Sequence, residues 1–126
     1  MLKKKVKEAA LDKLHIQWSD SLETSLGQLQ HIDAITRQLQ KSIPDRSIQQ
    51  NMVALRNKIL MEKNVVSAIA EEVSMFRKMF SHHSKQNLIT ADDMIENDRL
   101  RERVYKVEHY VTMLRYDVNQ LLSGAI

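Results

Sequence analysis

Apolar residues recur at every third or fourth position along almost the whole chain, and only two short stretches interrupt the pattern. This spacing places apolar side chains on one face of an α-helix. Glycine and proline, which end helices and form the turns of β proteins, occur only 2 times and 1 time in 126 residues. The chain is therefore predicted to be all-α, with long helices and short connections.

The first interruption lies at residues 43–47. Pro44 cannot continue a helix, because its ring clashes with the preceding turn and it lacks a backbone N–H. Ser47 followed by Gln50 fits a capping box, in which each side chain bonds to the backbone of the other residue. One helix should therefore end before Pro44, and the next should begin close to Ser47.

The second interruption lies at residues 81–90 and ends with Thr90 followed by Asp93, which resembles a capping box with Asp in place of Glu. Acidic residues in the turn that follows suit the positive end of a helix dipole. At 1.5 Å per residue, the helices separated by these interruptions would be roughly 50–60 Å long. The predicted helices cover about 2–42, 46–80 and 91–123.

Helices of this length and regularity favour coiled-coil-like packing. Because the connections are short, the three helices should be antiparallel neighbours, running up, down and up, in one domain that covers residues 1–126. The middle helix has a third apolar column beside its two main ones, so we expect it to contact two helices and form the centre of the bundle. The third column contains Ala54, Met61, Ala68 and Met75.

The last helix carries a narrow apolar seam between charged flanks, with Val in one column and mostly Leu in the other. This distribution is typical of two-stranded parallel coiled coils, in which a lone core Asn fixes the register. Two hypotheses stay open: the seam packs inside its own chain, or it joins two chains into an oligomer. The seam residues are Asn97, Leu100, Val104, Val107, Val111, Leu114, Val118 and Leu121.

Three polar residues fall near one height of the predicted bundle, to within about one helical turn. Glu62 interrupts an apolar column of the middle helix, Ser25 interrupts one in the first helix, and Tyr110 lies opposite them on the last helix. These residues predict a polar layer, which can fix the register of helices although it seldom adds stability. The alternative is that Glu62 reaches solvent at an edge of the bundle.

The sequence carries no pattern of residues that would support catalysis. It has no Cys, no glycine-rich phosphate loop and no metal-binding or nucleophile motif. His82 and His83 are interpreted as a solvated polar turn, because the spacing supplies no third metal ligand. A histidine phosphotransfer module is the minor alternative. We therefore predict a protein that is not an enzyme and that uses no cofactor and no metal.

Positive charge is concentrated at the N-terminal end. Five lysines and two acidic residues give residues 1–13 a charge of +3, which equals the net charge of the chain. A cluster of this kind attracts anionic lipid or nucleic acid only weakly and in a salt-sensitive way. The lysines of this basic end that lie closest together are Lys3, Lys4, Lys5 and Lys7.

Continuous seams without catalytic residues predict a non-enzymatic helical module for protein–protein interaction. It would be a subunit or adaptor of a larger assembly, or a small chaperone for a helical partner, with partners contacting the seams of the second and third helices. The alternative is a peripheral membrane or nucleic-acid factor that acts through its basic end. No apolar run reaches the length of a membrane span and no signal peptide is recognised, so we expect a cytoplasmic protein, with a nuclear location left open.

Overall fold

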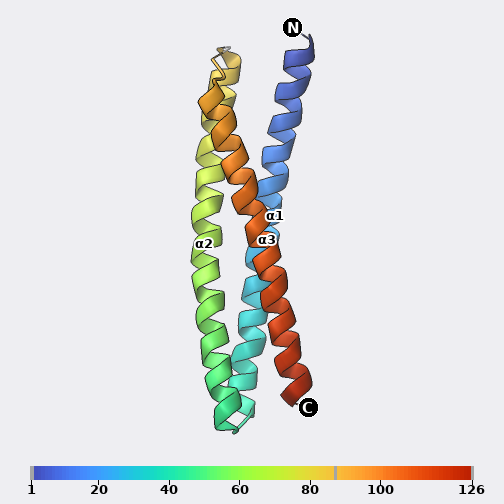
Figure 1. Cartoon of the computed structure of the whole chain (residues 1–126), viewed down its shortest axis with the longest axis vertical. Coiled ribbons are helices and arrows are strands. Elements are labelled where there is room, and N and C mark those ends of the chain that lie inside the picture. Colours follow the sequence, from blue (N-terminus) through green and yellow to red (C-terminus); the bar gives the residue numbers. More distant parts are fainter. Residues whose placement is uncertain (1, 87, 126) are drawn as a thin grey trace.

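The chain forms a bundle of three helices (Figure 1). A computed structural model describes the backbone of residues 2–86 and 88–125 and the side chains of 7–86 and 88–124. Every helix packs against the other two, and the described residues form no strand. These findings confirm the all-α bundle. The helices are α1 (Leu2–Ser42), α2 (Arg46–Lys85) and α3 (Ala91–Ala125).

The chain reverses direction at each of the two connections (Figure 1). The ion pairs between α1 and α2 follow the same order, because Asp12 near the start of α1 contacts Arg77 near the end of α2, whereas Asp33 contacts Arg56. Residue numbers that rise along α1 therefore fall along α2. Whether the helices also supercoil as in a coiled coil stays a prediction.

The first connection follows from Pro44 and the residue after it. The chain is non-helical at residues 43–45, and Asp45 caps α2 by accepting hydrogen bonds from the backbone N–H groups of Ser47 (2.8 Å) and Ile48 (3.1 Å). The capping box predicted at Ser47 is therefore wrong. Asp45 is itself a strong capping residue, so α2 begins at Arg46 and Ser47 already lies in its first turn.

The second connection contains the predicted capping box. The backbone N–H of Thr90 donates to Asp93 Oδ2 (2.9 Å), and the backbone N–H of Asp93 donates to the Thr90 hydroxyl (3.2 Å). The bond from the backbone of Thr90, together with a contact to His83, lowers the pKa of the Asp93 carboxyl below its ordinary value. α3 therefore begins where the sequence predicted.

α2 continues to Lys85, five residues beyond its predicted end near residue 80. No glycine or proline interrupts this stretch, and its basic side chains favour the negative end of the helix dipole. His82 and His83 are therefore helical and not part of the turn. His83 Nδ1 lies 3.0 Å from Asp93 Oδ2, which joins the end of α2 to the start of α3.

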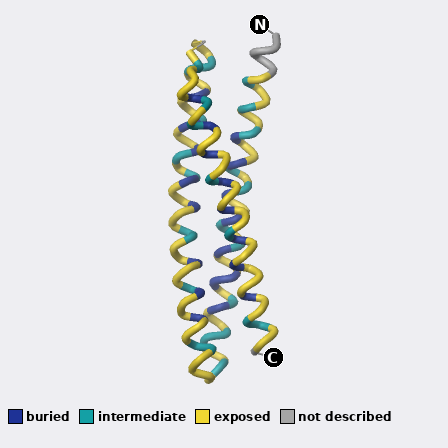
Figure 2. The backbone as a smooth tube through the Cα atoms, viewed as in Figure 1, coloured by how far each residue is buried: buried dark blue, intermediate teal, exposed yellow. Residues whose placement is uncertain are grey.

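The core consists of the seam columns of the three helices, which face one another along the bundle (Figure 2). All the buried residues of α2 are hydrophobic, whereas α1 also buries polar ones. The prediction that α2 forms the centre is wrong, because each helix contacts both others and the third apolar column of α2 is exposed. The buried residues of α2 are Met52, Leu55, Ile59, Val66, Ile69, Val73, Phe76 and Phe80.

Candidate interaction surface

The third apolar column of α2, which we call the outer column, faces solvent. Each of its members follows a buried residue by two positions, and two positions correspond to about 200° around a helix. The side chains therefore point away from the core, and Met61 and Met75 are 69% and 63% exposed. The outer column consists of Ala54, Met61, Ala68 and Met75, all of which are exposed.

Further apolar side chains flank the outer column on both sides. Val53 and Leu60 lie on one flank, and Val65 and Met79 lie on the flank next to α3; all four are exposed. Exposed hydrophobic residues are ordinary when they are scattered, but a continuous strip is typical of a surface that binds another molecule. The outer face of α2 is therefore the candidate interaction surface of this chain.

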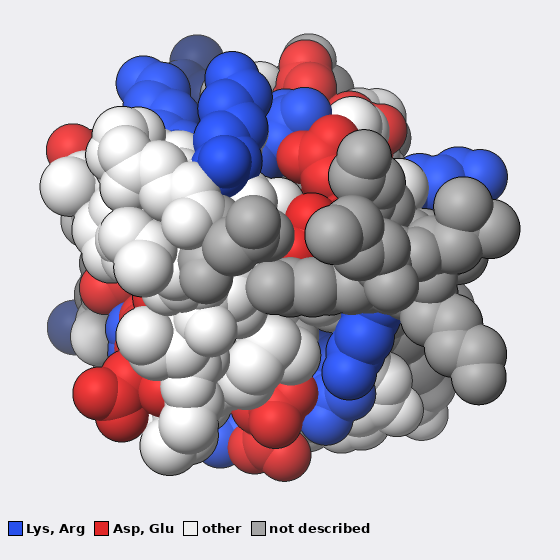
Figure 3. Space-filling model, turned by 90° about the horizontal axis from the view of Figure 1, so that it is seen from above, with Lys and Arg blue, Asp and Glu red and all other residues white. Residues whose placement is uncertain are grey.

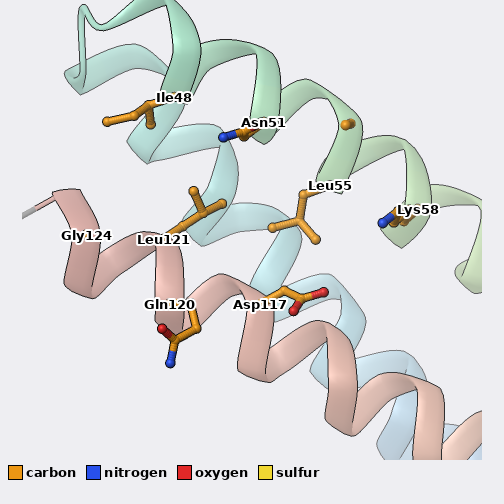
Figure 4. A pocket seen from close by; sticks show the side chains of 9 residues that line it. Ile48, Asn51, Leu55, Lys58, Asp117, Gln120, Leu121 and Gly124 are labelled. Carbon is orange, nitrogen blue, oxygen red and sulfur yellow. The ribbon is translucent and has the colours of Figure 1, made fainter.

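Two hollows open along the groove between α2 and α3, beside this surface. One has a volume of about 440 Å³, and Figure 4 shows Leu55 of α2 and Leu121 of α3 pointing into it. The other has a volume of about 590 Å³ and lies nearer the middle of the bundle. Its lining residues are Glu62, Val65, Ile69, Arg103, Tyr105, Lys106, Val107, His109 and Tyr110.

Of the predicted polar layer, Glu62 and Tyr110 line the same hollow, and Ser25 is buried. Glu62 is half-buried, and its burial raises the pKa of its carboxyl above the ordinary value. No hydrogen bond joins these three side chains, all of which belong to the described part of the chain. The structure thus brings Glu62 and Tyr110 together without linking them to Ser25, and a role in register stays a prediction.

The seam of α3 lies inside the bundle. The residues from Leu100 to Val118 in its two columns are buried, and Leu121 is half-buried. Asn97, which could fix the register of a dimer, instead bonds within the chain, because His15 Nε2 lies 2.7 Å from its Oδ1. A dimer through this seam would therefore have to open the bundle.

His15 is a buried polar residue that the sequence analysis missed. It lies seven residues before the core residue Leu22, so the heptad spacing could have found it. Its ring is fully buried and packs against three aromatic rings, with centroids 4.9 Å from Trp18 and 5.3 Å from Phe76 and Phe80. The His15 Nδ1 atom is buried without a hydrogen-bond partner. A polar contact in the core therefore sits near one end of the bundle.

The basic end is only partly described. The side chains of Lys3, Lys4 and Lys5 lie outside the described residues, and Lys7 is exposed. Figure 3 shows Lys and Arg side chains mixed with Asp and Glu over the described part of this end. One of the nearby basic residues, Arg77, is paired with Asp12 at 3.1 Å. The described part of this end is therefore a surface of mixed charge.

No family model, curated protein or solved structure matches the chain. Within the described residues, no group of His, Cys, Asp and Glu side chains is arranged to hold a metal ion. None of the described helices has an apolar stretch that could cross a membrane.

Proposed function

We propose that this chain is a non-enzymatic helical module that binds a helix of a protein partner along the outer face of α2. The exposed apolar strip formed by the outer column and its flanks supports this proposal most directly. A core that is already filled by the seam columns does not need these residues for folding. Their exposure costs solubility, and contact with a partner would offset that cost.

The spacing of the outer column suits a helical partner. Its members recur every seven residues, which is the repeat that keeps two packed helices in contact along their length. Met side chains are flexible and adapt to a partner's surface, whereas Ala lets two helix backbones approach closely. Full burial of one exposed Met side chain contributes about 1.5–3 kcal/mol. Burial of Met61 and Met75 together would thus contribute about 3–6 kcal/mol to binding, to which the other exposed apolar residues of this face would add.

Two roles are compatible with such a surface. A subunit or adaptor would keep its partner bound within an assembly, whereas a small chaperone would cover an apolar helix of its partner and release it later. Both roles use the same contact and predict the same loss of binding when the outer column becomes polar. They differ in the lifetime of the complex, which the dissociation rate reports.

Site-specific photo-crosslinking tests the proposal. A crosslinking amino acid at Ala68 in the outer column of α2 should capture a partner in cells, whereas one at Thr24 on the outer side of α1 should not. The captured protein, once purified, should bind the wild-type chain. It should bind the Met61→Gln, Met75→Gln double variant at least about tenfold more weakly, because two buried Met contacts are lost. Equal affinity for the two chains would exclude this surface.

The hypothesis of a membrane or nucleic-acid factor depends on the basic end. The mixed charge of the described residues there gives it little support. Binding to anionic vesicles and to duplex DNA, measured while salt is raised, separates the two hypotheses. Binding that persists near physiological salt and is lost in a Lys3→Gln, Lys4→Gln, Lys5→Gln variant would favour the basic end over α2.

A further inference from the structure

The outer face of α2 complements itself when two copies of the helix lie side by side in opposite directions. We propose that the partner is a second copy of this chain, bound through α2 about a two-fold axis level with Asn64 and Val65. This inference rests on the proposed function and names the occupant of the surface. The sizes and the charges of the exposed residues of α2 support this antiparallel dimer.

Side-chain sizes match in this arrangement. An axis at residues 64–65 places Met61 opposite Ala68 of the second copy, and Ala54 opposite Met75 of the second copy. Each large side chain thus meets a small one, which lets two helices pack at the usual distance of about 8–10 Å between axes. Val65 lies on the axis and meets its own symmetry mate, which is the self-contact expected of a two-fold interface.

Charges match in the same register. Lys58 lies opposite Glu72 of the second copy, and two-fold symmetry produces this pair twice. Glu72 already contacts Arg99 and Arg103 of its own chain, but its side chain is 43% exposed and can accept another partner. The polar residues on the other flank, Asn57, Asn64 and Glu71, include no pair of like charges in this arrangement.

A parallel arrangement of two copies is disfavoured by the same residues. Lys58 and Glu72 lie on the same flank of α2, and two parallel helices place each flank against the opposite flank of the second copy, so a parallel pair would lose the attraction between Lys58 and Glu72. Met61 would also meet Met61, where two large side chains crowd each other, and Ala68 would meet Ala68, where two small side chains leave a gap. The sequence of α2 therefore selects the antiparallel pair.

The area buried between the two copies of α2 indicates how strongly the dimer should associate. The strip from Asn51 to Met79 is about 40 Å long and about 10 Å wide, from the rise and diameter of a helix. Two such faces bury roughly 800 Å², which is less than stable interfaces bury and is in the range of weak, transient association. We therefore expect a reversible dimer that dissociates at micromolar concentration.

Charge reversal at one contact tests the register. Lys58→Glu and Glu72→Lys should each weaken the dimer about tenfold, measured by sedimentation equilibrium, since like charges then face each other twice. An equimolar mixture of the two variants should associate as strongly as wild type, because every facing pair is again of opposite sign. Circular dichroism checks that each variant remains helical. If the mixture is no stronger than the separate variants, the register is wrong.

Disulfide crosslinking provides a second, independent test, because the chain has no Cys of its own. Under mild oxidation, Asn64→Cys near the axis should form a covalent dimer, whereas Thr24→Cys on α1 should stay largely monomeric. Equal crosslinking of the two variants would overturn the interface.

A wild-type chain that stays monomeric at several hundred micromolar would overturn the second copy as the partner. The proposed function fails separately, if photo-crosslinking at Ala68 captures neither another protein nor a second copy. A monomer that still crosslinks to another protein at Ala68 would therefore exclude the dimer and retain the interaction module.

Discussion

α1 and α2 are neighbours of similar length, but they place polar and apolar residues in opposite ways. Among its residues with described side chains, 7–42, α1 buries four polar ones, and its outer column, at the positions that correspond to those of α2, is polar. α2 buries only hydrophobic residues, and its outer column is apolar. The buried polar residues of α1 are His15, Ser25, Asp33 and Thr36, and its outer residues are Gln17, Thr24, His31 and Gln38.

The buried polar residues of α1 and the exposed apolar residues of α2 have different consequences for the fold. Buried polar groups must meet particular partners, as His15 meets Asn97 and Asp33 meets Arg56, so they restrict how α1 packs. The apolar core of α2 imposes no such restriction, and its outer face has hydrophobic area left over. α1 therefore helps to define the fold, whereas α2 provides the surface that we propose for a partner.

The largest expected effect is on the buried polar pair of α1 and α3. Asn97→Ala should destabilise the bundle by about 2–3 kcal/mol, because it leaves His15 Nε2 without a partner and creates a cavity. A His15→Leu, Asn97→Val double variant should lie within about 1 kcal/mol of wild type, since both polar groups are removed together. Chemical denaturation measures both values. A double variant as unstable as Asn97→Ala would show that the unpaired His15 Nε2 does not cause the loss of stability.

The next largest effect is expected at a buried ion pair between α1 and α2, compared with an exposed ion pair between the same helices. Asp33 contacts Arg37 at 3.2 Å and Arg56 at 3.3 Å, and its side chain is 5% exposed, whereas Asp12, which contacts Arg77, is 51% exposed. Asp33→Ala should therefore cost about 1.5 kcal/mol, and Asp12→Ala less than about 0.5 kcal/mol. Denaturation curves of the two variants provide the comparison. Equal costs would contradict the assignment of polar specificity to buried positions.

A smaller effect of opposite sign is expected at Glu62, the one polar exception in the seam columns of α2. Glu62→Leu should stabilise the bundle by about 1 kcal/mol at pH 7, because a partly buried carboxylate is replaced by an apolar side chain. Thermal unfolding of Glu62→Leu measures the gain, and Glu62→Gln separates the loss of charge from the added apolar contact.

The advantage of the Glu62 variants should depend on pH. Burial raises the pKa of Glu62 in the folded chain, so the folded state binds its proton first as the pH falls. The wild type therefore regains stability between the raised pKa and the ordinary value of about 4.3. The advantage of Glu62→Gln should be greatest at pH 7 and shrink towards pH 4. A constant difference would show that the carboxylate is not desolvated.

The smallest expected effect on stability concerns the outer column. The Met61→Gln, Met75→Gln double variant should unfold within about 0.5 kcal/mol of wild type, because both side chains are already exposed. The same variant should lose association, which sedimentation detects. Thr24→Gln on α1 is the matched control and should change neither property. A large loss of stability in the double variant would place these Met residues in the fold and not in binding.

Much of the fold followed from the sequence because helix boundaries and seams are local features. Pro44 and the Thr90–Asp93 box mark two helix boundaries through the backbone positions next to them. The seam columns follow from the period of the helix. The two wrong helix boundaries also have local causes. Asp45, and not Ser47, caps α2, and no glycine or proline at 81–85 ends this helix.

The sequence by itself determined three helices, their breaks and the faces that become buried, because a repeat of apolar residues and a few caps define these features. Only the tertiary structure decided that the seam of α3 closes the chain's own core and that His15 meets Asn97, 82 residues away. It also decided that the outer column of α2 faces solvent. In a bundle of three, each helix packs against two others, so an apolar face that is wider than these two contacts leaves part of its area exposed to solvent.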